Sequence, residues 1–364
     1  MNSALRVIIL TPTALPNVTG NAITAERWRR SLSQKGNVVK VTETQHLDAR
    51  SLVDILDRFR PHIVHAHHIS RAGEIMLDPF VSEKYGHLPL VVSPAGTDIN
   101  LYTTKESERE KVGRICRRAR SIIAQSRETV GSLQQLMPEL QERIVYVPKA
   151  FLWLGNESYD LRAVAGCREE DILFFMPAGI RPVKGNLECL SVMAKAHEAS
   201  SKIRIIFAGP ALDAEYAALF EEEINRLQSF AKWILQIPSQ AMCSAYGGAD
   251  VVLNHSRSEG LSNSLLEAMA AGRPVLASDI PGNRWVIHDE KGIGPCGCLF
   301  TPHDHTDFVR KALQFVDDSA FRESLAARGR LRAAEWPSPA DEARALLGIY
   351  REAISEKIIE GSQT

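Results

Sequence analysis

Short apolar runs alternate with longer amphipathic stretches along almost the whole chain. A short apolar run bounded by turn residues is typical of a buried strand, whereas the longer stretches have the periodicity of helices. This β-α-β alternation predicts an α/β protein built on parallel sheets with helices on both faces. The expected strands are residues 6–10, 38–41, 62–67, 90–94, 121–126 and 145–148, followed by 171–178, 203–209, 233–238, 250–255 and 274–278.

The alternation restarts after a polar, poorly periodic stretch between residues 151 and 170, which is the expected linker. A chain of 364 residues is long enough for two domains of roughly 150 residues each. Ligands of open parallel sheets bind outside the carboxyl ends of the strands, so a cleft between two such domains is the expected site. The expected division is a Rossmann-like domain over 1–160, a second over 161–337, and a helix in 338–364 that packs back on the first domain.

Composition excludes several classes of protein. Hydrophobic residues make up 45% of the chain and charged residues 24%, as in ordinary globular proteins. Lys and Arg (43) nearly balance Asp and Glu (44), so no nucleic-acid partner is expected. No apolar run approaches the roughly 20 residues that cross a bilayer. We therefore expect no integral membrane segment and a cytoplasmic location, with the six scattered cysteines as free thiols.

The clearest chemical pattern lies between residues 249 and 283. It predicts a buried strand, a small polar loop, a short helix closed by Gly272, and a further strand. Glu259 is expected on the loop and Glu267 in the first turn of the helix. The turn between them presents backbone N–H groups at a helix N-terminus, where unpaired donors and the helix dipole favour an anion. This turn comprises Gly260, Leu261, Ser262, Asn263 and Ser264.

Two carboxylates beside an anion-binding turn suit a nucleotide sugar. Glu267 can accept hydrogen bonds from ribose hydroxyls while the phosphates lie on the turn and Glu259 faces the sugar. Each carboxylate also has a structural explanation. Ser264 and Glu267 have the spacing of a capping box, in which the glutamate bonds backbone N–H groups, and Glu259 on its own fits a solvated loop charge.

Over nearly its whole length, the sequence resembles the retaining glycosyltransferases of the GT-B fold, family 4. Their hallmark is two glutamates separated by seven residues in this strand-loop-helix setting, as at Glu259 and Glu267. Gly-Arg-Pro-Val at 272–275 and Pro-Gly-Asn at 281–283 continue the match. The resemblance implies two Rossmann-like, doubly wound domains facing a cleft, with Glu259 on the donor sugar, Glu267 on the ribose, and the turn on the phosphates.

A second group of candidate residues follows the strand expected at 171–178. Gly179 permits the backbone to turn, and the cations Arg181 and Lys184 can converge on a pyrophosphate, with a bidentate fork from arginine and a compact charge from lysine. Taken alone, this spacing also fits ordinary surface charge. In the resembling family, the matching arginine and lysine bind the donor diphosphate and stabilise its charge as the glycosidic bond breaks.

The first loop carries Gly20 and Asn21, before a helix expected from Thr24 to Lys35. A glycine at a helix entry permits close approach of a phosphate, although a simple turn glycine also fits. The full G-x-G-x-x-G fingerprint is missing from this loop, which disfavours a dinucleotide-dependent oxidoreductase. In the family, the equivalent loop closes over the phosphates. The runs at 19–27 and 96–100 most resemble the subgroup that contains glycosyltransferase 1 domain-containing protein 1.

One position departs from the family pattern. Many members carry a histidine that meets the donor sugar just before the Gly-Thr-Asp-like stretch, and this chain has Ala95 there. Asp98 or a histidine such as His67 are candidate substitutes on the sugar or acceptor side. The spacing of His65, His67 and His68 also resembles that of metal ligands, but histidines at strand ends are more often structural or face an acceptor.

The sequence therefore predicts a retaining glycosyltransferase that takes its sugar from a nucleotide diphosphate-sugar, with UDP expected as the carrier on family grounds. Glu259, Arg181 and Lys184 are the expected catalytic residues, and electrostatic stabilisation of the diphosphate makes a metal or other cofactor unnecessary. The sequence specifies neither the acceptor nor the oligomeric state. Three alternatives remain: a thio- or selenosugar synthase, a nucleotide-sugar epimerase, and a catalytically inactive nucleotide-sugar-binding protein.

Overall fold

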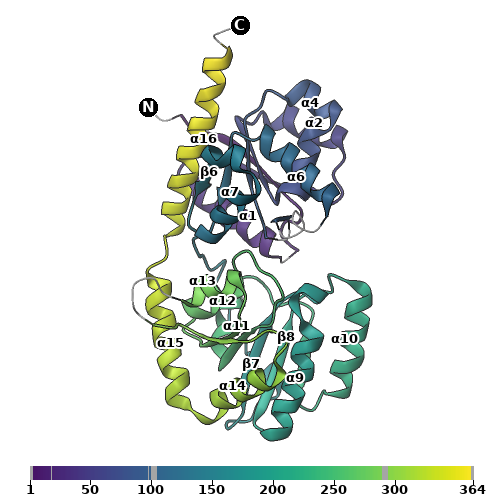
Figure 1. Ribbon diagram of the computed structural model, residues 1–364, viewed down its shortest axis with the longest axis vertical. Coiled ribbons are helices and arrows are strands. Elements are labelled where there is room, and N and C mark those ends of the chain that lie inside the picture. The colour runs from purple at the N-terminus through teal and green to yellow at the C-terminus, as the bar shows by residue number, and fades with distance from the viewer. Residues whose placement is uncertain (1–2, 18, 97, 100–104, 289–293, 362–364) are drawn as a thin grey trace. The chain divides into compact units, whose positions relative to one another are not determined.

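The expected alternation of strands and helices is present in both halves of the computed structural model, which describes residues 3–17, 19–96, 98–99, 105–288 and 294–361 (Figure 1). The chain divides into two compact units. The N-terminal unit comprises Met1–Leu152 together with Pro337–Thr364, and the C-terminal unit comprises Trp153–Trp336. Within the described residues, each unit contains a six-stranded sheet whose paired strands are all parallel.

The N-terminal sheet has the strand order β2-β1-β3-β4-β5-β6. Its inner strands are buried on both faces, which explains why they read as nearly continuous apolar runs in the sequence. The order reverses at β1, because β2 pairs with one of its edges and β3 with the other. The strands are β1 (Arg6–Thr11), β2 (Val38–Glu43), β3 (Ile63–His67), β4 (Leu90–Ser93), β5 (Ser121–Ala124) and β6 (Ile144–Tyr146).

Helices cover both faces of this sheet. Alternate residues of a strand point to opposite faces, and accordingly Ile8 and Leu10 pack with α2, α3, α4, α6 and α7, whereas Val7 and Ile9 pack with α1 and α16. The helices are α1 (Gly20–Gln34), α2 (Ala49–Phe59), α3 (Ile69–Gly73), α4 (Pro79–Tyr85), α6 (Glu106–Arg118), α7 (Arg127–Leu136) and α16 (Pro339–Gly361), with 3-10 turns η1 (Glu74–Leu77) and η2 (Pro138–Arg143).

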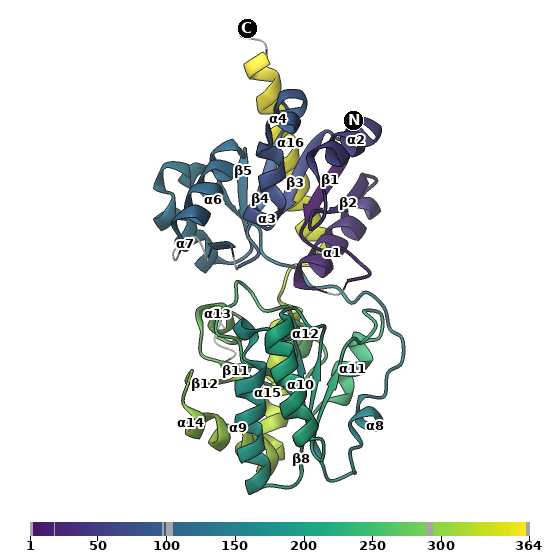
Figure 2. The ribbon, with the colours of Figure 1, turned by 90° about the vertical axis from the view of Figure 1, so that its right-hand side faces the viewer.

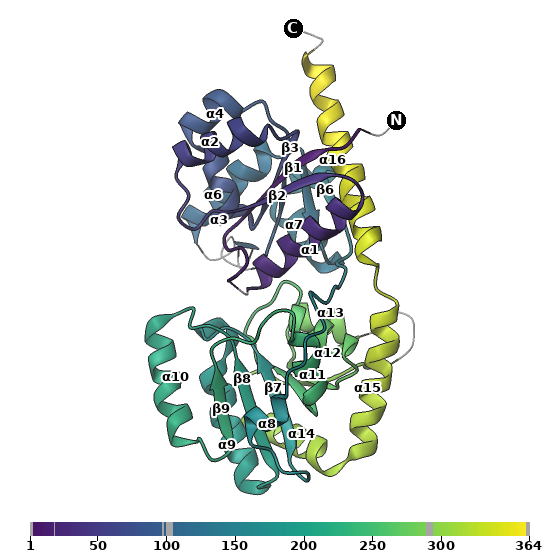
Figure 3. The same ribbon diagram turned by 180° about the vertical axis from the view of Figure 1, so that it is seen from behind.

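The C-terminal helix α16 belongs to the N-terminal unit and lies beside α1 (Figure 3). Its apolar face, which includes Leu346 and Tyr350, is buried in the same core as Trp28 of α1. Arg27 also makes a buried bidentate ion pair with Glu342, at 2.8 and 2.9 Å, and the two side chains are 3% and 0% exposed. Helix α16 is therefore part of the core of the N-terminal unit.

The C-terminal sheet has the order β12-β11-β10-β7-β8-β9. Phe174 of β7 packs with α9, α10 and α14 on one face, and Phe175 meets Tyr246 of α11 on the other. Figure 2 shows these helices around the sheet. The strands are β7 (Ile172–Pro177), β8 (Ile203–Ala208), β9 (Ala231–Ile234), β10 (Val251–Asn254), β11 (Val275–Ser278) and β12 (Cys298–Phe300). The helices are α8 (Leu161–Ala165), η3 (Pro182–Lys184), α9 (Asn186–Ala199), α10 (Ala214–Arg226), α11 (Met242–Gly248), α12 (Asn263–Ala270), α13 (Pro281–Ile287), α14 (His305–Asp317) and α15 (Ser319–Ala334).

The segment from residue 153 to 160, which the sequence-based division places in the first domain, lies in the C-terminal unit. Its backbone is bonded there, since the N–H of Glu157 donates to the carbonyl of Gln240 and the N–H of Tyr159 donates to Ser244 Oγ at 2.9 Å. A Cβ on Gly155 would lie 2.6 Å from Cβ of Gln240, so this position packs closely as well. These contacts connect residues too far apart in the sequence for local pattern to reveal.

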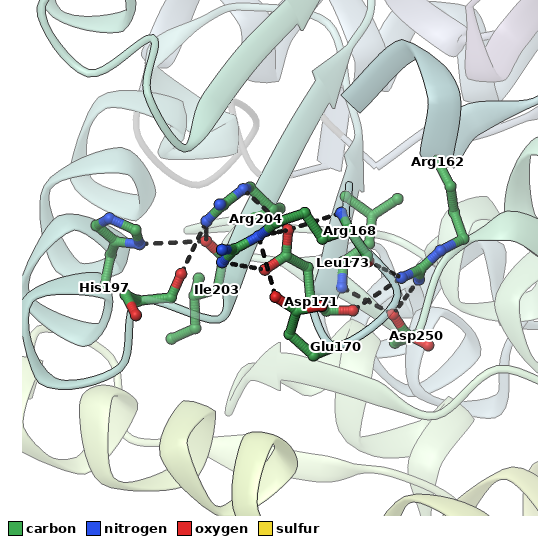
Figure 4. A network of polar contacts seen from close by, with 10 residues as sticks. Arg162, Arg168, Glu170, Asp171, Leu173, His197, Ile203, Arg204 and Asp250 are labelled. Atoms are coloured by element: carbon green, nitrogen blue, oxygen red, sulfur yellow. Dashed lines mark hydrogen bonds and ion pairs between the residues drawn. The ribbon is translucent and has the colours of Figure 1, made fainter. Parts of the chain in front are cut away.

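Charged residues at the amino ends of the C-terminal strands form a structural network (Figure 4). The Asp171 side chain, which is 0% exposed, lies 3.1 Å from Nη2 of Arg168 and 3.3 Å from Nε of Arg204. Next to it, Arg162 of α8 is paired at 2.6 Å with Asp250, which precedes β10. This network lies at the opposite edge of the sheet from the strand carboxyl ends, where ligands bind in such folds.

Strand β9 spans Ala231–Ile234 and so lies earlier than the expected residues 233–238. Two further details also differ from the sequence-based expectation. Helix α1 begins at Gly20 instead of Thr24, because the Thr19 side chain accepts a hydrogen bond from the N–H of Ala22 and caps the helix there. Strand β12 was not expected at all. It has only three residues, and a stretch of that length carries no periodicity.

Candidate functional site

The order of strands in the C-terminal sheet reverses between β7 and β10. From β7 the chain moves outward through β8 and β9, and then returns to add β10, β11 and β12 on the other side. The chain therefore leaves the neighbouring strands β7 and β10 in opposite directions at the carboxyl edge of the sheet. Ligands of open parallel sheets bind at such a point. Residues 178–185 and 255–262, which contain most of the expected site residues, form the loops after these two strands.

The loop after β7 is shaped by two glycines. Gly185 has φ +64°, and a Cβ there would lie 2.6 Å from the carbonyl oxygen of His255, so only glycine fits without strain. Gly179 is similarly close to Leu212, at 2.4 Å from a built Cβ to Cδ1. Arg181 lies between these glycines; it is half-buried and its N–H donates to Asn186 Oδ1 at 3.2 Å. The Gly185 contact brings this loop against the loop after β10.

Lys184 and Glu259, one from each loop, form an ion pair in which Nζ lies 2.5 Å from Oε1. Their side chains are 18% and 12% exposed, so solvent screens the pair only partly. Burial raises the pKa of Glu259, but the charge and hydrogen bond of Lys184, with further bonds from Ser256 and Asn254, more than offset this, and the pKa falls below its ordinary value. The carboxylate is therefore ionised at neutral pH.

Beneath this ion pair lies a network of buried polar side chains. Ser256 Oγ donates to Glu259 Oε1 at 2.7 Å, and Asn254 Nδ2 reaches the same oxygen at 3.2 Å. Asn254 is also bonded to Ser262 and to Asn283. These bonds link the ends of β10 and the starts of α12 and α13 to the Glu259 carboxylate.

The turn after Glu259 leads into α12, which begins at Asn263 with Ser262 as its N-cap residue. Gly282, in the first turn of α13, packs against this turn. A Cβ at Gly282 would lie 2.5 Å from the carbonyl oxygen of Glu259 and 2.9 Å from that of Gly260. Gly260 and Leu261 are partly exposed on this turn, and Asn263 opens the helix. The N–H groups of the helix start and the helix dipole suit an anion.

Glu267 lies one turn into α12 and is half-buried. Its Oε2 accepts a hydrogen bond of 2.6 Å from Oη of Tyr246, a fully buried residue of α11. Burial first, and then the Glu267 charge, raise the pKa of Tyr246 well above its ordinary value, so the hydroxyl remains protonated and donates. Because α12 begins at Asn263, the placement of Glu267 in the first turn and the capping-box interpretation with Ser264 are both wrong.

The remaining expected residues lie in the N-terminal unit. Gly20 and Asn21 open α1, immediately after the Thr19 cap, at the loop that follows β1. Gly20 is exposed and Asn21 is half-buried. This loop lies at the point where the order of the N-terminal sheet reverses, which is the usual place for a ligand. Their part in phosphate binding stays a prediction.

His67 and Asp98 are more buried than a sugar-facing role suggests. His67 is 3% exposed and its Nδ1 lies 3.0 Å from Ser93 Oγ; burial is the main cause of a pKa well below its ordinary value. Asp98 is 0% exposed, and its oxygens accept bonds from the N–H groups of Ile69 at 2.7 Å and Ala95 at 3.0 Å. Asp98 thus shapes the loop around Ala95. Thr97 and Asn100 lie outside the described residues.

The histidines near β3 are engaged with protein groups. Both ring nitrogens of His65 are bonded, Nδ1 to Tyr350 Oη at 2.7 Å and Nε2 to Ser93 Oγ at 3.0 Å. His68 Nδ1 lies 3.6 Å from Asp98 Oδ2. Among the described residues, no cluster of three or more His, Cys, Asp or Glu side chains has the arrangement of a metal site. The metal-ligand interpretation of this spacing therefore has no geometric support in that part of the chain.

Sequence reasoning missed Asn254, Ser256 and Tyr246, each of which contacts one of the two glutamates. For Asn254 and Ser256 a signal was available, because polar residues at the end of a buried strand or just after it often lie at a ligand-binding edge. For Tyr246 none was available, since it lies 21 positions from Glu267 on another helix.

Two family models match the chain. The model described as glycosyl transferases group 1 matches residues 158–332, and the one described as glycosyl transferase 4-like matches residues 2–126. Among curated proteins, glycosyltransferase 1 domain-containing protein 1 of Xenopus tropicalis is 25% identical over 76% of this chain and 79% of its own length.

Solved structures share the fold. Anabaena HepE in complex with UDP and glucose has a TM-score of 0.76 at 15% identity, covering 96% of this chain and 100% of HepE. Sucrose-phosphate synthase from Thermosynechococcus elongatus has a TM-score of 0.78 at 14% identity, covering 97% and 100% of the two chains. These similarities identify the fold as GT-B. In the part of the chain that the structure describes, no helix combines the length and apolarity that crossing a bilayer requires.

Proposed function

We propose that this chain, whose residues 158–332 match the model of glycosyl transferases group 1 and whose residues 2–126 match the glycosyl transferase 4-like model, transfers a sugar from a nucleoside diphosphate sugar, with UDP as the carrier and with retention of anomeric configuration. The proposed partners are this donor and an acceptor that remains to be identified. The proposal rests on Lys184, Glu259 and the start of α12, which meet at the carboxyl edge of the C-terminal sheet.

The diphosphate is proposed to bind between the two basic side chains and the turn after Glu259. Lys184 is already held beside this turn by its ion pair with Glu259. Arg181 precedes it on the same loop and adds a planar guanidinium group suited to phosphate oxygens. Together with the N–H groups at the start of α12, these charges would stabilise the negative charge that develops on the leaving diphosphate. Such stabilisation needs no metal ion.

Glu259 and Glu267 are proposed to hold the two sugars of the donor. Glu259 is ionised at neutral pH because its pKa is depressed, and it would accept hydrogen bonds from hydroxyls of the transferred sugar. Glu267 lies further along α12 and would accept bonds from the ribose hydroxyls. For retention, the acceptor hydroxyl would approach from the side of the leaving group, and the departing diphosphate would take its proton. The bond from sugar to diphosphate breaks as the bond from sugar to acceptor oxygen forms.

UDP is proposed as the carrier because Anabaena HepE, which shares the fold, has been solved with UDP and with UDP-glucose. A thermal-shift panel of UDP-, GDP- and ADP-sugars on the wild type and on Glu267→Ala tests this. One nucleotide class should stabilise the wild type, and Glu267→Ala should lose most of that stabilisation. Glu221→Ala, an exposed change on α10, is the matched control and should behave as wild type. Equal shifts in Glu267→Ala and the wild type would contradict the ribose role.

A second candidate function is binding of a nucleotide sugar without turnover. The observation that favours it is Ala95, which has no polar side-chain atom and whose N–H is committed to Asp98. Release of UDP from UDP-glucose in the presence of a panel of sugar and lipid acceptors separates the two candidates. A glycosyltransferase should release UDP only when a suitable acceptor is present, whereas a binding protein would bind UDP-glucose and leave it intact.

A further inference from the structure

The side-chain amide of Asn254 has a hydrogen-bond partner for each of its donors and acceptors. Its Oδ1 accepts from the N–H of Ser256 at 3.0 Å and from Nδ2 of Asn283 at 3.2 Å. Its Nδ2 donates to Ser262 Oγ at 2.9 Å and to Glu259 Oε1 at 3.2 Å. Asn254 is 4% exposed, so these bonds are shielded from water.

The orientation of this amide follows from chemistry. The N–H of Ser256 can only donate, so the atom of Asn254 that faces it must be the oxygen. The NH2 group then faces Glu259 and Ser262. Rotating the amide by half a turn would place its oxygen against the Glu259 carboxylate, where no proton is shared. Asn254 is therefore fixed as a donor to Glu259.

The partners of Asn254 are themselves held in place. Asn283, which is 0% exposed, donates to the carbonyl oxygen of Ser278 at 3.0 Å. Ser278 Oγ donates to the carbonyl oxygen of Ser256 at 2.6 Å. The network thus closes on itself through the ends of β10 and β11 and the starts of α12 and α13, and it fixes the path of the loop that carries Glu259.

We infer that Asn254 is a positioning residue that orients Glu259 toward the donor sugar. This inference rests on the proposed function of Glu259. Lys184 bonds the same carboxylate, but a diphosphate would compete for its charge, whereas Asn254 and Ser256 would keep their bonds when the donor is bound. Of these two, Asn254 also bonds Ser262 at the start of α12 and Asn283 of α13, so it has the more extensive connection to the elements around the loop of Glu259.

The diagnostic variant is Asn254→Asp, which keeps the shape of the side chain, removes both N–H donors and places a second carboxylate beside Glu259. The probes are UDP, which has no transferred sugar, and UDP-glucose, titrated by calorimetry. The affinity of Asn254→Asp for UDP should stay within about twofold of the wild-type value. The factor by which the protein binds UDP-glucose more tightly than UDP should fall by about tenfold or more. Asn225→Asp makes the same chemical change at an exposed position of α10 and should match the wild type.

A second measurement does not depend on the donor. The carboxyl 13C signal of Glu259, assigned by its disappearance in Glu259→Gln, is titrated with acid in the wild type and in Asn254→Asp. Loss of the amide donor and addition of a like charge should raise the pKa of Glu259. Ser256→Ala is a milder variant that removes one donor to the same oxygen of Glu259. Like Asn254→Asp, it should raise the pKa of Glu259 and reduce the additional affinity for UDP-glucose over UDP.

The outcomes separate the inference from the proposed function. If Asn254→Asp binds UDP-glucose as the wild type does, or weakens UDP and UDP-glucose equally, the positioning role is overturned. If the wild type binds no nucleotide sugar, the proposed function fails, and the titration alone decides whether Asn254 controls Glu259. An unchanged pKa of Glu259 in both Asn254→Asp and Ser256→Ala would then overturn the inference.

Discussion

Nζ of Lys184 lies 2.5 Å from Oε1 of Glu259, although the two residues are 75 positions apart in the sequence. Each charge is neutralised by the other in a partly buried setting. A bound diphosphate would compete with the carboxylate for the charge of Lys184, so donor binding and the ionisation of Glu259 should be coupled.

Replacing Lys184 by methionine should raise the pKa of Glu259, because burial, which raises that pKa, would no longer be offset by the lysine charge. The pKa of Glu259 is depressed in the wild type, so the ionised form persists to low pH and is lost only as the pH falls through that depressed value. In Lys184→Met this loss should occur at higher pH. The carboxyl 13C titration of Glu259 measures it, and Lys195→Met, at an exposed position of α9, is the control.

Replacing Tyr246 by phenylalanine removes the 2.6 Å hydrogen bond to Glu267 and leaves the ring packed against Phe175. The affinity for UDP should fall by about threefold to tenfold, the equivalent of roughly one hydrogen bond. The affinity for inorganic pyrophosphate, which has no ribose, should stay the same. Equal losses for both ligands in calorimetry would indicate that Tyr246 acts on the whole site and has no particular effect on the ribose carboxylate.

Replacing Glu342 by alanine should destabilise the N-terminal unit, because it leaves the buried charge of Arg27 without its partner. Removing one partner of a buried ion pair typically costs about 3–5 kcal/mol of the free energy of unfolding. Arg344→Ala breaks the exposed pair with Asp341, whose side chains are 71% and 50% exposed, and should cost at most about 0.5 kcal/mol. Urea denaturation of the two variants would contradict this account if their losses were similar.

Replacing Asp171 by asparagine should weaken the C-terminal unit in a pH-dependent way. Burial raises the pKa of Asp171, but its bonds and charges with Arg168 and Arg204 lower it overall. A carboxyl group with a depressed pKa in the folded state stabilises the protein above its unfolded pKa and loses this effect as the pH falls through the folded value. The variant should therefore be less stable than wild type at neutral pH by about 1–3 kcal/mol, and the difference should shrink in acid.

Denaturant melts of Asp171→Asn at neutral and acidic pH measure that change. Asp317→Asn, an exposed change at the end of α14, should show little difference from wild type at any pH. A stability difference for Asp171→Asn that is constant with pH would mean that the carboxylate charge has no part in the network of Figure 4.

The fold could be predicted from the sequence where side-chain pattern is set by burial. The runs at β1 and β7 are apolar because they are covered on both faces, and that requirement is visible without any structure. The start of α1 is predicted at the wrong residue because its capping residue, Thr19, lies in a polar loop. Side chains of such residues can hydrogen-bond the backbone in turns as well as at helix N-termini, so the sequence alone does not identify the cap. Strand β12 forms because it pairs with β11, and a run of three residues is too short for its sequence pattern to predict a strand.

The charged residues of the candidate site could be predicted from the sequence, whereas the specific hydrogen bonds that hold them in place could not. Lys184 and Glu259 each follow a buried strand, so their meeting at one edge of the sheet follows from topology. The Asn254 amide bonds Glu259 on a neighbouring loop, and the Tyr246 hydroxyl bonds Glu267 on another helix. Sequence spacing does not specify those contacts, because they arise only once the sheet and its helices have packed.

The central claim is that Lys184 and Glu259 belong to one site for a nucleoside diphosphate sugar. Calorimetric titration of UDP and UDP-glucose into the wild type, Lys184→Ala and Glu259→Gln tests it most directly. Lys184→Ala should weaken both ligands by about tenfold or more, whereas Glu259→Gln should bind UDP at least as tightly as the wild type and lose the additional affinity for UDP-glucose. Wild-type affinities for both ligands in both variants would contradict the claim.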